Sequence, residues 1–219
     1  MDTLKEGGEK IMKCKKYILP GILIGCLLFG GIVIASRDDF FFVAKVGDFA
    51  KTLRRNIEEG DTGEILLRGE HVSVQRDQYE QSRKFYLAIG LGEKEASESA
   101  LVYCKEFNSL YHEAIRKNYD VSDGELEKYI DEMRENFHSA NVSPESVQIY
   151  RAILKQFDSE DQYWEYQKKV YQKQLPIEKM NRDLEEEFYQ KNPQASSEDW
   201  EKEFQKIKDE LVLKENFHN

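Results

Sequence analysis

The stretch SESALVYCKEFNSLYHEAIRKNYDVSDGELEKYI, residues 97–130, decides the fold. Its first part places apolar side chains at helical spacing along one stripe, from Ala100 to Ile115. Ser122 and Glu125 then form a capping box, the pattern that begins a new helix. Two amphipathic helices joined by a short turn predict a body that is built by packing helices against one another.

The same signals continue towards the C-terminus. Helix starts are predicted at Ser143-Pro144, at Ser159 with Gln162, and at Ser196 or Ser197. The chain has no fixed repeat of about 30–50 residues, which argues against a solenoid. Because the apolar stripes are wide and uneven, we expect an interlocked, orthogonal helical domain and not a long coiled coil.

One β signal precedes these helices. Ile65–Leu67 is a short apolar run, Arg68–Glu70 is a turn, and His71–Val74 follows as a second short run. We therefore expect an all-α domain over residues 64–219 that opens with a small N-terminal β-hairpin.

A membrane segment is predicted near the N-terminus. Tyr17–Ser36 is uncharged over twenty residues, and a helix of that length spans about 30 Å, the thickness of the hydrocarbon core of a bilayer. Lysines cluster before it, so residues 1–16 are expected to be a basic cytoplasmic stub and the body to lie outside. Residues 37–63 are expected to be a membrane-proximal linker.

Two other interpretations of this segment stay open. It could be a buried core helix, although twenty uncharged residues are rare in soluble folds. It could also be a signal peptide, since Leu23–Cys26 resembles a bacterial lipoprotein processing box with Cys26 as the lipidated residue. The apolar run continues after Cys26, which favours an anchor helix. The anchor helix and the lipoprotein both place the body on a membrane and outside the cytoplasm.

Charge and cysteine content exclude several classes of protein. The chain has 32 basic and 42 acidic side chains, a formal net charge of −10. Residues 37–219 carry 27 of the basic and 39 of the acidic ones, so the body has a net charge of −12. A nucleic-acid-binding body would need the opposite sign. Three cysteines exclude a disulfide scaffold.

Motifs for catalysis, metals or nucleotides are incomplete. His112-Glu113 begins like a zinc-protease helix, but Arg116 occupies the position of the second histidine. Gly90-Leu91-Gly92 has neither the third glycine nor the lysine of a nucleotide loop. We therefore assign no catalytic residue, metal or cofactor, and we do not expect the chain to be an enzyme.

Four aromatic residues at one place in the chain have two interpretations. Three of them share a helix face, which favours a place in the core. Alternatively, partly exposed rings could line a groove for an extended peptide. On the second interpretation, the candidate client-binding residues are Tyr163, Trp164, Tyr166 and Tyr171.

The order of these motifs resembles the SurA-type N-terminal chaperone domain. Leu67–Ser73 followed by Gln78-Tyr79 is similar to the opening strands and helix of that family. Leu110–Leu126 is similar to the segment in which one helix of that family ends and the next begins at a capping serine. Ser159–Tyr166 is similar to the acidic and aromatic start of a helix in membrane-attached members. The resemblance covers residues 65–190 and implies an extracytoplasmic helical chaperone fold.

The family often carries a parvulin-type prolyl isomerase domain as well. Residues 140–219 show no β alternation, so we expect no isomerase activity. The expected function is a membrane-anchored, ATP-independent chaperone-like protein that binds unfolded or secreted polypeptides. The alternative is a structural or regulatory membrane protein whose helical body binds one specific folded partner.

Overall fold

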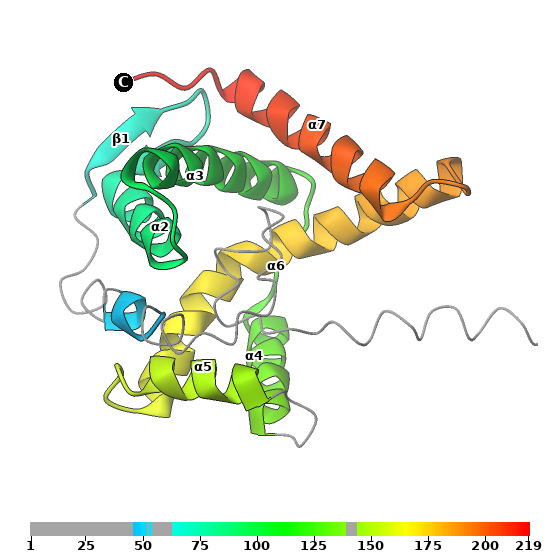
Figure 1. The fold of residues 1–219 in the computed structure, drawn as a ribbon. Coiled ribbons are helices and arrows are strands. Elements are labelled where there is room, and N and C mark those ends of the chain that lie inside the picture. The colour runs from blue at the N-terminus through cyan, green and yellow to red at the C-terminus, as the bar shows by residue number, and fades with distance from the viewer. Residues whose placement is uncertain (1–45, 52, 54–62, 139–143) are drawn as a thin grey trace, which may run out of the picture.

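The computed structural model describes residues 46–51, 53, 63–138 and 144–219. A short helical stretch over residues 46–51 precedes a β-hairpin, and six further helices follow the hairpin (Figure 1). The elements are β1 (Ile65–Arg68), β2 (Ser73–Gln75), α2 (Arg76–Ala88), α3 (Glu93–Arg116), α4 (Asp123–His138), α5 (Pro144–Leu154), α6 (Glu160–Lys191) and α7 (Ser197–Glu215). The mainly helical fold and the small hairpin are confirmed.

The hairpin has the predicted place and direction. β1 and β2 are antiparallel, with Leu67 opposite Val74 and Arg68 opposite Ser73. The turn between them is closed by a hydrogen bond of 2.7 Å from the Gly69 amide to the Val72 carbonyl. Val74 is fully buried and directs this face of the hairpin into the helical core.

The C-terminal tail extends the hairpin by one bridging residue. Arg68 and His218 exchange two backbone hydrogen bonds of 2.8 and 2.9 Å, and the Glu70 amide donates to the Glu215 carbonyl at 2.9 Å. Figure 1 shows the C-terminus beside β1. No sequence pattern indicates this pairing, because a single bridging residue has no periodicity of its own.

Helix α3 supplies the centre of the core. It packs against α2, α6 and α7, and its inward stripe includes Tyr103, Cys104, Phe107 and Leu110. Cys104 is buried, and its sulfur lies 3.6 Å from the Ser82 hydroxyl oxygen. Ile115 was expected on this stripe but is 39% exposed, because it lies at the edge of the buried face, next to the fully buried Ala114.

The predicted caps define the later helices. α4, α6 and α7 begin directly after Ser122, Ser159 and Ser196, and α5 begins at Pro144; its predicted cap, Ser143, lies outside the described residues. Ser122 forms the expected reciprocal capping box with Glu125. Ser159 also accepts from the Gln162 amide at 3.1 Å, but the Gln162 side chain bonds the Asp158 amide in place of the Ser159 amide.

The long helix α6 links two groups of elements. Figure 1 shows the hairpin, α2, α3 and α7 around one part of it, with α4 and α5 beside its beginning. Past α3, the end of α6 and the start of α7 extend away from the other helices. We call residues 184–207 the α6–α7 arm.

The expected linker, residues 37–63, contributes to the core. Residues 46–51 are helical, and Val46, Phe49 and Ala50 are buried. The Phe49 ring packs edge-on against Phe85 of α2 at 5.4 Å. The packed domain therefore begins before residue 64, at least as early as Val46. The short apolar spacing in this stretch was too brief to distinguish a packed helix from a linker.

The predicted membrane helix, Tyr17–Ser36, lies outside the described residues and stays a prediction. Within the part of the chain that the structure describes, no helix is long and apolar enough to cross a bilayer.

Candidate functional site

Three of the four aromatic candidates belong to the core. Tyr163 and Tyr171 are fully buried, and Trp164 is 4% exposed. Their rings pack against aromatic partners from α4 and α5, including Tyr129 at 5.0 Å from Tyr171 and Tyr150 at 5.8 Å from Tyr163. The shared helix face therefore has the core role that its spacing favoured, and these three rings are closed to a client.

Tyr166 is the accessible member of the set. Its side chain is half-buried, and its hydroxyl accepts a hydrogen bond of 2.7 Å from Gln81 of α2. Its ring lies 6.3 Å from that of Phe157. It packs against the edge of the core and is more exposed than the other three rings.

A carboxylate at the start of α6 joins three helices. The Glu160 atom Oε1 lies 3.0 to 3.1 Å from donor atoms of Arg134, His138, Tyr150 and Trp164. Burial alone raises the pKa of Glu160, but the hydrogen bonds from His138, Trp164 and Tyr150 outweigh it and lower the pKa to about 2. This network fixes α4 and α5 on the start of α6.

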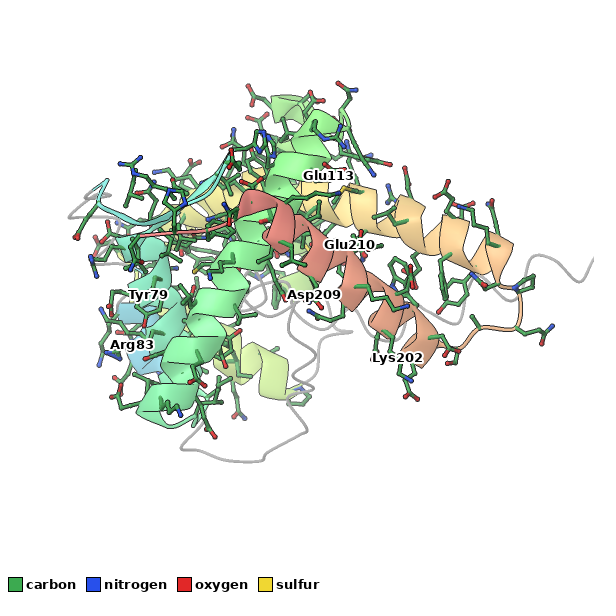
Figure 2. All side chains as sticks on the ribbon, turned by 90° about the horizontal axis from the view of Figure 1, so that it is seen from above. Tyr79, Arg83, Glu113, Lys202, Asp209 and Glu210 are labelled. Carbon is green, nitrogen blue, oxygen red and sulfur yellow. The ribbon has the colours of Figure 1, made fainter. Side chains whose placement is uncertain are left out.

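A buried ion pair holds α7 across α3. Lys208 Nζ lies 2.9 Å from Glu106 Oε2, and both side chains are less than a tenth exposed. The other oxygen of Glu106 accepts from Gln205 at 3.0 Å. In Figure 2, α7 crosses α3, with Asp209 and Glu210 labelled on it. The pair sets the position of α7 on the body.

Partly accessible aromatic side chains gather on the α6–α7 arm. Trp200 lies between Phe188, at 5.5 Å, and Phe204, at 5.4 Å, measured between ring centroids. Trp200 is buried, whereas Phe188, Phe204 and Ile207 are half-buried. The arm thus carries partly accessible apolar side chains at the edge of the core.

Three potential metal ligands meet where the hairpin, α3 and α7 join. Nδ1 of His71 lies 3.4 Å from Glu215 Oε1, and Nδ1 of His112 lies 3.7 Å from the same oxygen. The two imidazole rings are stacked, with centroids 4.9 Å apart and planes 15° apart. In the described part of the chain, these residues form a group whose ligand atoms all lie within 4.8 Å of one another.

Sequence reasoning assigned no metal site and did not consider this group. His71 and Glu215 are separated by 144 positions, and His112 lies on a helix that neither shares. Arg116 in place of the second histidine argues against a zinc-protease helix, but it carries no information on ligands from other segments. No local spacing could have indicated the group, because the pairing of the C-terminal tail with the hairpin creates it.

No family model matches the chain, and neither the curated proteins nor the solved structures contain a match. The resemblance to SurA-type domains therefore stays a prediction from the sequence motifs.

Proposed function

We propose that the chain is a membrane-anchored, extracytoplasmic, ATP-independent chaperone-like protein of the SurA type. Tyr17–Ser36 is its proposed anchor, and unfolded or secreted polypeptides are its proposed clients. The observation that carries the proposal is the order of elements. A hairpin leads directly into α2, and α3 is followed by a turn after which α4 begins at the N-cap residue Ser122. This is the order of elements that the sequence resemblance implies.

The α6–α7 arm provides a surface of the kind that a holdase needs. Weak capture of an unfolded chain requires apolar surface that is accessible but too small to cause self-association. Phe188 and Phe204 are half-buried on the arm, and acidic side chains such as Glu186 and Glu187 are exposed beside them. Repulsion among acidic faces favours solubility. We therefore assign client contact chiefly to the arm, with Tyr166 as a second position.

Prolyl isomerase activity is not part of the proposal. Among the described residues from 144 to 219, the regular elements are the helices α5, α6 and α7, with His218 forming a single bridge. A parvulin domain needs a sheet and about a hundred residues of its own. A holdase needs no catalytic group, only a surface and, at a membrane, a tether that raises its local concentration.

An aggregation assay tests this function. The full chain in detergent micelles should suppress light scattering by several chemically unfolded clients without ATP, and should leave the isomerisation rate of a proline peptide at background. Phe188→Ser should weaken suppression, and Gln190→Ser, an exposed position on the same helix, should not. Circular dichroism must show equal helix content in both variants.

Each outcome has a defined meaning. If the intact chain suppresses none of the clients, the chaperone proposal fails. Stable binding of one folded protein, without binding to unfolded chains, would instead support the partner-specific scaffold. If Phe188→Ser retains full suppression, the chaperone proposal survives and the arm is not the contact surface.

A further inference from the structure

We propose that His71, His112 and Glu215 form a binding site for a divalent transition-metal ion, with Zn²⁺ as the best fit. This inference is independent of the proposed function. The site would join the β1–β2 turn, α3 and the end of α7 through a single ion.

Glu215 is built as a fixed ligand. Its side chain is 6% exposed, so it is a carboxylate taken out of water. Its Oε2 atom accepts hydrogen bonds from the backbone amides of His71, at 2.8 Å, and Val72, at 3.2 Å. These bonds fix the orientation of the carboxylate and direct Oε1 at the two imidazoles.

Gly69 permits this arrangement. A Cβ atom at position 69 would lie 2.8 Å from Glu215 Oε2 and 3.0 Å from the Val72 carbonyl oxygen. The first distance is shorter than real Cβ contacts and the second is tighter than most of them, so a side chain here would displace the carboxylate or the turn. The glycine allows the hairpin to close tightly over Glu215.

The distances at Oε1 fit metal ligands better than hydrogen-bond partners. An N–H···O hydrogen bond spans about 2.7–3.2 Å, and both histidine contacts, at 3.4 and 3.7 Å, are longer than that. Ligands of a tetrahedral zinc ion, each about 2.0–2.1 Å from the metal, are separated from one another by about 3.3–3.4 Å. His71 already has this separation from Glu215, and His112 lies a few tenths of an ångström farther away. Because the two rings are stacked and the ligand atoms are within 4.8 Å of one another, metal binding requires the imidazoles to turn so that both nitrogens face one point.

The chemistry of the three ligands selects the ion. Two imidazole nitrogens and one carboxylate oxygen form a set that zinc proteins use with a fourth position open to water. Imidazole also suits Cu²⁺ and Ni²⁺, whereas Mg²⁺ and Ca²⁺ prefer oxygen ligands. The His71 side chain is 62% exposed, so the open position faces solvent and an ion can enter. A metal ion bound at this site would also balance the negative charge of the buried Glu215 carboxylate.

Metal titration tests the site. The full chain is purified in detergent without a histidine tag, stripped with a chelator and dialysed against Zn²⁺. We expect one Zn²⁺ ion to bind per chain, and we expect this binding to require His71. At a free Zn²⁺ concentration 100 times the dissociation constant, the thermal midpoint should rise by about 5–10 °C. Mg²⁺ at the same concentration should leave it unchanged.

Two variants and one control identify the ligands. His71→Ala changes an exposed side chain, and Glu215→Gln keeps an oxygen that can accept the two amide hydrogen bonds, so both should fold and both should lose the ion. The control is His218→Ala, which removes an exposed histidine of the C-terminal tail that is not one of the three ligands; this variant should bind Zn²⁺ as the parent does. The proposal is overturned if the parent binds no Zn²⁺, or if His71→Ala and Glu215→Gln bind it as the parent does.

Discussion

Replacing Lys208 by methionine tests how α7 is held on α3. The change keeps the length of the side chain and removes its charge, so Glu106 loses the ammonium 2.9 Å from its Oε2 atom. Gln205 would still donate to the other oxygen of Glu106. A carboxylate that is 8% exposed would then stay in the core without its cation.

The size of the effect follows from this burial. Removing one partner of a buried ion pair costs about 3–5 kcal/mol, because the remaining charge is desolvated without compensation. Exposed pairs contribute about 0–1 kcal/mol, so the two cases are separable by experiment. For a domain of this size, the larger cost lowers the thermal midpoint by about 6–20 °C.

The assay is equilibrium unfolding in urea, followed by circular dichroism, on the parent, on Lys208→Met and on the double variant Glu106→Leu with Lys208→Met. The double variant should recover most of the loss, since an apolar pair of similar volume can replace a buried ion pair. Gln205 keeps an acceptor in it, the Asp209 carboxylate at 2.9 Å. A loss below about 1 kcal/mol in Lys208→Met would match an exposed pair and would refute the docking of α7 described here.

Three further predictions concern other parts of the chain. Trp164→Ala should cost about 3–5 kcal/mol in urea unfolding, because a large buried ring is lost, whereas Tyr166→Ser at a half-buried position should cost clearly less. The pKa of Glu160 is lowered to about 2, below its usual 4.5, so its stabilisation is complete above pH 4.5 and is lost as the pH falls towards 2. In an acid titration, the Glu160→Gln variant should not show this loss of stability. If its stability falls with pH as that of the parent does, the prediction is wrong. Deletion of Tyr17–Ser36 should leave residues 37–219 helical and soluble without detergent; a precipitate or a β-type circular dichroism spectrum would count against this.

Local sequence patterns predicted the elements and several of their boundaries. Capping serines such as Ser122 act within one helical turn, so their effect is visible in a short window of sequence. The stripe of α3 was likewise readable, because burial repeats with the helical period. The pattern failed at Ile115, which lies at the edge of the buried face although Ala114 in the same turn is fully buried. Periodicity predicts which side chains share a face, but it does not predict where that face stops being covered.

The site residues depend on contacts that no local pattern contains. The sequence placed Tyr163, Trp164 and Tyr171 on one face, which favoured the core, but a shared face does not by itself exclude a groove. Only the packing of α4 and α5 on α6 distinguishes the two. Glu215 was one of 42 acidic residues and had no distinguishing neighbour in the sequence. Its role depends on where the last turn of α7 meets the hairpin.

Backbone contacts between the hairpin and residues near the C-terminus affect the order in which the domain folds. A two-stranded ribbon is only marginally stable alone, and here its backbone groups at Arg68 and Glu70 are bonded by residues near the C-terminus. Contacts so distant in sequence must offset a large loop-closure entropy, so we expect them to form after the local helices. An ion shared by His71 and Glu215 would stabilise only this closed state, because its ligands meet nowhere else. Binding of metal would then report completion of the fold, independently of any client on the α6–α7 arm.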